Sequence, residues 1–211
     1  MHFGQFVEHY KQHPLIRSRL FDFLEEDPGL LRRQVTDWLK KEWLLEVKRG
    51  VYVVKDPSRR CPASLYFLAT HLVTPAYISL ETALSYYQLI PERVDALTCI
   101  TSKKTQRLHT PLGYFIYRHI KQSAYNFFVP VLDEFNRQFY IATAEKALID
   151  YLYFHTSNIR MLDKDYFSEA LRLQNTEILS MDRLIEAAKS FGQKKLIQSV
   201  ETLIEFIKDE A

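Results

Sequence analysis

The chain has 211 residues, 47% of them hydrophobic, and a formal net charge of +2. This length suits one large domain or two small ones, and the apolar fraction allows a sizeable core. No run approaches the roughly 20 apolar residues that span a membrane. Polar side chains also interrupt the N-terminal segment, where a signal peptide has its apolar core. We therefore expect a cytoplasmic protein that does not contact a membrane.

Helices are predicted along most of residues 1–40. Apolar residues recur at helical spacing over residues 3–12, and Pro14 allows a second helix, which we expect over residues 15–24. Asp27 can cap a third helix in which Pro28 takes the first position. One face of this third helix is apolar, with Leu31, Val35, Trp38 and Leu39. The opposite face is polar and basic, with Arg32, Arg33, Thr36, Asp37 and Lys40.

A β-hairpin is predicted over residues 44–54. Two short β-rich runs flank Arg49 and Gly50, and glycine tolerates the positive φ of a tight turn. Lys48 and Arg49 are therefore expected at the hairpin tip. Helices followed by a hairpin are typical of a winged helix-turn-helix, in which the last helix enters the major groove and the hairpin touches phosphates.

Positive charge is concentrated in this part of the chain. Residues 30–60 contain nine basic and four acidic side chains, a surplus of five, whereas residues 151–211 contain eight basic and ten acidic ones. A local basic region on a nearly neutral chain indicates a phosphate-binding surface. The alternative interpretation is a solvated helix face without a ligand.

The basic side chains of the third helix and the hairpin suggest two kinds of contact with double-stranded DNA. An arginine near the start of the helix can bind the edge of a guanine, whereas lysines and the hairpin arginine suit phosphates. The predicted DNA-binding residues are Arg32, Arg33, Thr36, Lys40, Lys48 and Arg49.

A polar segment with two prolines, residues 55–62, is the predicted linker. We therefore predict an α+β protein of two domains. The first is a winged helix-turn-helix over residues 1–58, and the second is a mixed α+β domain with a helical C-terminus over residues 59–211.

Two short helices are expected after the linker. The first covers residues 65–72. The second begins at Leu80, is capped by the Ser79 side chain accepting a hydrogen bond from the amide of Thr82, and is ended by Pro91.

Strands and further helices complete the second domain. β-branched and aromatic residues predict strands over residues 97–101 and 114–120, and one more within 135–142, with irregular structure over 121–134. The remaining chain is expected to be helical: a helix capped by Thr143, a segment over residues 163–173, and a helical hairpin of residues 181–191 and 193–208 joined at Gly192.

Three blocks of residues carry a family resemblance. They are Tyr77–Tyr87 with Leu89–Glu92, then Thr110 with Gly113, Phe115, Tyr117, Arg118 and Ile120, then Ile141–Ala142 with Ala144–Asp150. Together they resemble the AbiE antitoxins, the regulator halves of type IV toxin–antitoxin (abortive infection) operons, over residues 30–155. Gln88 stands where we expect glycine in that pattern.

The resemblance implies a DNA-binding transcriptional autorepressor that binds inverted repeats in its own operator. It also implies an antitoxin that opposes a nucleotidyltransferase toxin without requiring direct contact, through residues that the resemblance does not specify. The chain lacks the Gly-Ser or Gly-Gly strand-loop and the paired Asp-X-Asp of a nucleotidyltransferase, so we do not expect it to be the toxin.

Two other functions remain open. Glu81, Asp95, Lys103 and Lys104 could form a Mg²⁺-dependent nuclease site that the winged helix brings to DNA. The chain could instead be a protein-interaction module that does not bind DNA. Because no tight carboxylate-X-lysine unit follows Asp95, and the pair of lysines suits a loop between strands, we expect no enzyme.

No cofactor is expected. The five glycines form no phosphate-binding loop, and there is no Gly-X-Ser-X-Gly motif. Cys61 and Cys99 are too few and too far apart for a zinc site or a disulfide framework. His109 and His119 could face the same side of a strand, but a metal site needs more ligands than two.

Overall fold

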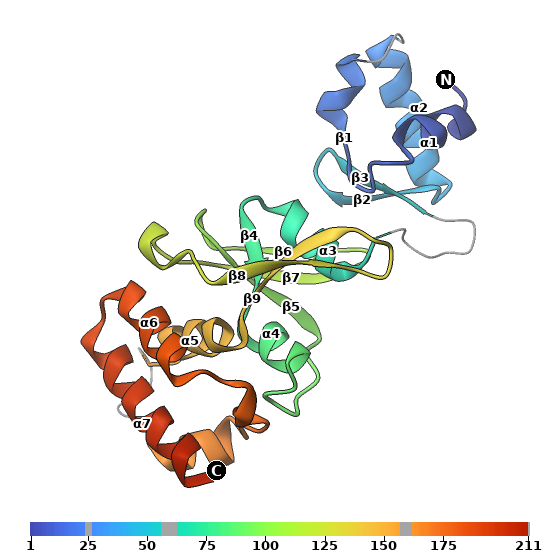
Figure 1. Cartoon of the computed structure of the whole chain (residues 1–211). Helices are drawn as coiled ribbons and strands as arrows, with labels where there is room; N and C mark the ends of the chain where they lie inside the picture. Colours follow the sequence, from blue (N-terminus) through green and yellow to red (C-terminus); the bar gives the residue numbers. More distant parts are fainter. Residues whose placement is uncertain (24–26, 56–62, 157–161, 211) are drawn as a thin grey trace.

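The computed structural model describes residues 1–23, 27–55, 63–156 and 162–210. It is a mixed α+β protein with N-terminal helices and a small antiparallel sheet, a six-stranded mixed sheet, and C-terminal helices (Figure 1). We call residues 1–55 the head and the described residues from 63 onward the body. The predicted linker and the domain boundary at residue 58 lie outside the described residues, except for Lys55.

The head combines short helices with a three-stranded antiparallel sheet in the order β1-β3-β2. Its helices α1 and α2 and the hairpin of β2 and β3 confirm three of the predicted elements. In chain order the head contains α1 (Phe3–Tyr10), β1 (Ile16–Arg17), a 3-10 helix (Ser18–Phe23), α2 (Pro28–Lys40), β2 (Leu44–Lys48) and β3 (Val51–Val54).

The helix predicted over residues 15–24 is wrong. Ile16 and Arg17 form β1, which pairs with Tyr52 and Val51 of β3, and a 3-10 helix follows. Pairing gives Val51 and Tyr52 of β3 a second neighbouring strand, and the β-branched Ile16 side chain is completely buried. This tertiary contact outweighs the local helical periodicity, as is common for short segments rich in apolar residues.

The strand β3 lies between two hydrophobic cores. Successive side chains of a strand point to opposite faces. Tyr52 and Val54 pack against the head core, which also contains the apolar face of α2, whereas Val51 and Val53 belong to the core of the body. The head is therefore packed against the body through one face of its own sheet.

The body contains a six-stranded sheet in the order β6-β7-β5-β4-β9-β8. Strands β5 and β7 are parallel, as are β4 and β9, and the other neighbours are antiparallel. The strands are β4 (Ala76–Ile78), β5 (Ala96–Thr101), β6 (Gln106–Thr110), β7 (Gly113–His119), β8 (Phe128–Leu132) and β9 (Gln138–Ala142).

Helices cover both faces of this sheet. α3 packs on one face, where the Tyr117 hydroxyl of β7 donates to the Ala69 carbonyl at 2.7 Å. α4 packs on the other, where Thr98 of β5 contacts Thr82. Figure 1 shows α6 and α7 at the end of the molecule opposite to the head. The body helices are α3 (Leu65–Leu72), α4 (Leu80–Tyr86), α5 (Ala144–His155), α6 (Met181–Phe191) and α7 (Lys194–Glu210).

The strands predicted over residues 97–101, 114–120 and within 135–142 are confirmed as β5, β7 and β9. The irregular segment expected over 121–134 is wrong in part, because β8 lies within it. Pro130 fits there because β8 is an edge strand, where the missing N–H of proline needs no partner. The short strands β4 and β6 were not predicted.

The C-terminal predictions are largely confirmed. The Thr143 side chain accepts a hydrogen bond from the Lys146 amide at 3.3 Å, and α6 and α7 form the expected pair around Gly192, which has a φ of 62°. The helix expected over residues 163–173 is reduced to a short segment with a π-helix at Tyr166–Ala170. None of the described helices has both the length and the apolar composition that crossing a membrane requires.

The predicted cap of α4 is wrong. The Ser79 hydroxyl donates to Asp150 Oδ2 at 2.7 Å, and the amide of Thr82 donates instead to Thr98 Oγ1 at 3.1 Å. The cap that we predicted from Ser79 is thus supplied by Thr98 of the neighbouring strand β5. α4 also ends at Tyr86, before Pro91 is reached.

Gln88 ends α4 in a conformation that favours glycine. Its φ is +58°, its amide donates to the Ser85 carbonyl at 3.0 Å, and the Leu89 amide donates to the Leu84 carbonyl at 2.8 Å. These two hydrogen bonds define a Schellman motif, in which the left-handed residue is usually glycine. The position where the family resemblance leads us to expect glycine is therefore one where a Cβ atom is strained.

Replacing Gln88 by glycine should stabilise the protein. Glycine adopts the left-handed region without steric cost, so we expect the free energy of unfolding to rise by about 0.5–1 kcal/mol. The matched control is Gln198→Gly in the interior of α7, which should lower it by about 0.5 kcal/mol. Urea unfolding of both variants measures the difference, and equal destabilisation by the two would show that Gln88 is not strained.

Candidate nucleic-acid interface

The helix α2 is fixed at its start and along its apolar face. Asp27 Oδ1 accepts a hydrogen bond from the Gly29 amide at 2.8 Å, and Pro28 occupies the first turn. The buried side chains Leu31, Val35 and Trp38 pack in the head core with aromatic and aliphatic residues of α1, β1 and the 3-10 helix. This packing leaves the other side of α2 facing solvent.

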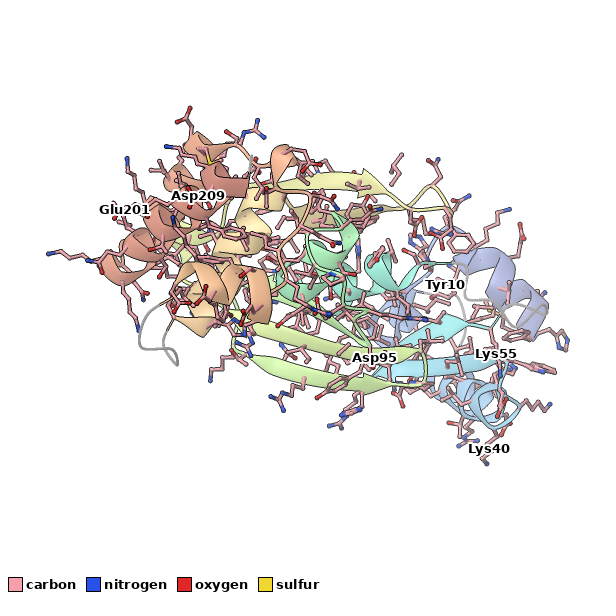
Figure 2. The ribbon with its side chains drawn as sticks, turned by 90° about the horizontal axis from the view of Figure 1, so that it is seen from below. Tyr10, Lys40, Lys55, Asp95, Glu201 and Asp209 are labelled. Carbon is pink, nitrogen blue, oxygen red and sulfur yellow. The ribbon has the colours of Figure 1, made fainter. Side chains whose placement is uncertain are left out.

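That solvent-facing side carries the predicted contacts. Arg33, Thr36 and Lys40 recur at intervals of three and four residues, so they share one face of the helix, and Arg32 lies beside them. All four side chains are exposed. The Thr36 hydroxyl donates to the Arg32 carbonyl at 3.0 Å, so its oxygen can still accept a hydrogen bond. Lys40 points away from the body (Figure 2).

The hairpin turn brings Arg49 to the same side of the head. Gly50 has a φ of +70°, and its amide donates to Glu46 Oε1 at 2.8 Å. The Gly50 carbonyl accepts a hydrogen bond from the Ser18 amide at 2.8 Å, and a Cβ atom on Gly50 would lie 2.7 Å from Ser18 Oγ. The positive φ therefore favours glycine at this turn, and any larger residue would also displace the Ser18 side chain. Arg49, just before it, is exposed.

A cavity of about 660 Å³ lies between α2 and the hairpin. Arg32 and Thr36 line it from α2, and Arg49 lines it from the turn. Glu46 is the acidic side chain in the lining. Two basic side chains that are 17 positions apart in sequence thus border one concave surface.

Lys48 is placed differently from the prediction. It is half-buried, and its Nζ donates to the Leu72 carbonyl at the end of α3 at 3.2 Å. Burial lowers the pKa of Lys48, and the positive charges of Arg17 and Lys103 lower it further. Only Arg49 of the expected hairpin-tip pair presents its charge to solvent.

Arg17 joins Lys48 at the C-terminus of α3. Its guanidinium donates to the His71 carbonyl at 2.9 Å, next to the carbonyl that Lys48 contacts. The last carbonyls of a helix lack intrahelical partners and carry negative partial charge, so two cations there stabilise the contact between head and body. The sequence did not indicate this role of Arg17, because its partner His71 lies 54 positions farther along the chain and no local pattern connects the two.

The residues of the alternative nuclease site do not converge. Asp95 directly precedes β5 and Lys103 follows its end, so the strand separates them by roughly 20 Å. Lys103 and Lys104 lie in the loop between β5 and β6, as expected. Glu81 is in the first turn of α4, where its charge is favourable to the helix dipole.

The two histidines do not share a side of the sheet. His109 pairs with Tyr114, whereas His119 is an odd number of residues farther along β7 and points to the opposite face. The expectation that they could face the same side is wrong. Within the described residues, no group of three His, Cys, Asp or Glu side chains is arranged to hold a metal ion.

Residues that carry the family resemblance form a buried polar network in the body. Lys146 and Asp150 of α5 form an ion pair with no solvent exposure. Asp150 Oδ2 also accepts hydrogen bonds from Tyr77 at 2.9 Å and Ser79 at 2.7 Å. The Lys146 ammonium lies 4.5 Å from the ring centroid of Phe191 in α6. These residues connect β4, α5 and α6.

The network opposes the cost of burying two charges. Burial raises the pKa of Asp150, while Lys146 and the two hydroxyl groups lower it. Burial lowers the pKa of Lys146, and Asp150 raises it. Glu145, next to Lys146, accepts a hydrogen bond from the Ser180 amide at 3.2 Å. The three charged residues of this block therefore have structural partners.

No protein-family model matches the chain, and no curated protein matches its sequence. The resemblance to the AbiE antitoxins thus rests on the three residue blocks. The geometry of the head provides an independent basis for a function.

Proposed function

We propose that the protein is a sequence-specific DNA-binding regulator whose head acts as a winged helix-turn-helix. The observation that carries this proposal is the common cavity bordered by Arg32 and Thr36 of α2 and by Arg49 of the hairpin. In that class of protein, the corresponding helix enters the major groove while the hairpin contacts the backbone. The short strand β1 supports this assignment, since it ties the hairpin to the segment preceding α2.

Within that class, we propose an AbiE-type antitoxin that represses its own operon in the cytoplasm. It would bind inverted repeats in the operator and oppose a nucleotidyltransferase toxin without necessarily contacting it. The three residue blocks of the family resemblance support this assignment to the AbiE antitoxins. Two of the blocks, the first and the third, meet in the buried network around Lys146 and Asp150.

The exposed side chains of the head divide into two roles. Arg32 and Arg33 lie in the first half of α2, where each guanidinium can bind O6 and N7 of a guanine. Lys40 at the end of α2 and Arg49 at the turn are placed to neutralise phosphates, which contribute affinity but carry little sequence information. Lys48 is left out of these contacts because its ammonium binds the Leu72 carbonyl.

A mobility-shift assay on the duplex upstream of the gene tests the proposal. The full chain should retard this duplex more strongly than a random duplex of equal length, and the affinity should fall as salt is raised. Retardation of neither duplex, even at low salt, would contradict DNA binding and favour a head that binds protein. Cleavage of the duplex with Mg²⁺ would favour the nuclease alternative.

Replacing Arg49 by alanine should weaken binding to all duplexes alike. Loss of one phosphate contact should reduce the steepness of log K against log salt by about 0.9. Lys48→Ala is the matched control, because it removes the neighbouring charge of the same hairpin and should leave the slope unchanged. Fluorescence anisotropy over a salt series measures both slopes, and an equal reduction in the two variants would contradict the different roles of Lys48 and Arg49.

A further inference from the structure

A second basic region lies in the body and has no acidic residue. Between Ala96 and Leu132 the sequence contains five lysines and arginines and no aspartate or glutamate. Most of this charge is on the edge hairpin of β6 and β7 and on the loop before it. The five basic residues are Lys103, Lys104, Arg107, Arg118 and Lys121.

The register of β6 and β7 places basic and aromatic side chains on one face. Arg107 is opposite Ile116 and His109 is opposite Tyr114, and directly opposite residues of an antiparallel pair point to the same side. Arg118 follows on the same face of β7. We call the residues on this face of β6 and β7 the outer strip; they are Arg107, His109, Tyr114, Ile116 and Arg118.

The outer strip is accessible where the neighbouring strand is not. Arg107 and His109 are exposed and Ile116 is half-buried, whereas Thr98, opposite Ile116 on β5, is buried beneath α4. The other face of β7 is closed, because Phe115 and Tyr117 are buried in the body core. The outer strip therefore extends the sheet face beyond α4, and α5 reaches it at the Arg118 end.

The two ends of the outer strip differ in chemistry. At one end the centroids of the His109 and Tyr114 rings lie 4.0 Å apart. Asp95 is near this end, because it directly precedes Ala96, the β5 residue that pairs with Tyr114. At the other end, Arg118 lies over the Phe154 ring of α5 at 4.8 Å, near the loop that contains Lys103 and Lys104. Four residue steps along β7 separate these ends, roughly 14 Å.

We propose that the outer strip binds single-stranded nucleic acid. Bases would stack on the rings of His109 and Tyr114. Arg107, together with Lys103 and Lys104 in the loop between β5 and β6, would neutralise the phosphates of the adjacent nucleotides. An open sheet face with aromatic rings and flanking cations is a common platform for single strands, since every base offers a ring face for stacking. This site is separate from the proposed operator contacts of the head.

A single strand fits the outer strip better than a duplex does. The bases of a duplex are stacked on one another, so the His109 and Tyr114 rings would find no base to contact. The major groove admits an α-helix or a two-stranded ribbon, whereas β6 and β7 are part of a sheet of six strands, which is too wide to enter it. Phosphate contacts alone would use Arg107 and the lysines but leave the rings and Ile116 without a role.

The test compares a short fluorescein-labelled oligouridine RNA with the upstream duplex, using the full chain and fluorescence anisotropy. Wild type should bind the RNA, and Arg107→Ala with His109→Ala should weaken that binding at least about tenfold, because one phosphate contact and one stacking ring are lost. Both side chains are exposed, so this variant should stay folded. Its affinity for the upstream duplex should remain that of wild type.

Two controls separate the outer strip from the head. Arg183→Ala, at an exposed position in the first turn of α6, removes one charge that is not part of the outer strip and should leave RNA binding unchanged. Arg32→Ala with Arg33→Ala should reduce duplex binding and leave RNA binding intact. The proposal is overturned if wild type does not bind the RNA, or if the strip variant binds it as Arg183→Ala does. Parallel loss of RNA and duplex in the strip variant would also overturn it, since the strip would then belong to the duplex-binding surface.

Discussion

Replacing both Arg32 and Arg33 by alanine should reduce the preference for the operator over random duplex by at least about tenfold. A bidentate contact between arginine and guanine contributes about 1–3 kcal/mol of discrimination, so even one lost contact has an effect of this size. Both side chains are exposed on α2, and the helix is fixed by Asp27 and by its buried face. We therefore expect the fold to be unchanged.

The ratio of the two dissociation constants, measured at one salt concentration, is the relevant quantity. General affinity should also fall, because two positive charges are removed. The matched control is Arg183→Ala with Lys189→Ala, which removes two charges from exposed positions of α6. It should leave the ratio unchanged. A head variant that keeps the wild-type preference would rule out sequence reading by these arginines.

Replacing Asp150 by asparagine should produce the largest loss of stability, about 3–5 kcal/mol in the free energy of unfolding. Asparagine keeps the size of the side chain, but it leaves the Lys146 charge buried without a counter-ion. Lys146 has no solvent exposure, so its ammonium cannot reach water without rearrangement of the core. Native domains are stable by only about 5–15 kcal/mol, so this single change should bring the protein close to unfolding.

Two further variants identify the cause of that loss. Adding Lys146→Met to Asp150→Asn removes the unpaired charge, so the double variant should be more stable than Asp150→Asn alone. Arg172→Ala breaks an exposed ion pair with Glu92 and should cost less than about 1 kcal/mol. Urea unfolding measures all three. An Asp150→Asn loss as small as that of Arg172→Ala would mean that the buried pair contributes little.

Elements with strong local signals could be predicted from the sequence. α2 has a capping aspartate, a proline in its first turn and an apolar stripe, and the hairpin has Gly50 at its turn. α3 and α6 have the predicted bounds. Short strands could not be predicted in the same way. β1 and β4 are two and three residues long, so they form only because a partner strand is present.

Individual side chains were harder to assign than elements. Ser79 has the residue type and position of a helix cap, yet its hydroxyl binds Asp150, which lies 71 positions away. Lys48 has the position of a solvent-exposed hairpin residue, yet its ammonium binds the end of α3. In both cases a distant polar group satisfies the side chain, and no local pattern indicates which distant group will be near.

The sequence by itself determined the helices with caps and apolar stripes, the hairpin around Gly50, and the surplus of positive charge in the head. These follow from interactions within a few residues, which periodicity and residue type report directly. Only the tertiary structure decided that Arg32 and Arg49 border one cavity, that Lys48 faces the body, and that Asp150 is the common partner of Tyr77, Ser79 and Lys146. The physical reason is that burial and charge pairing depend on which segments meet in space.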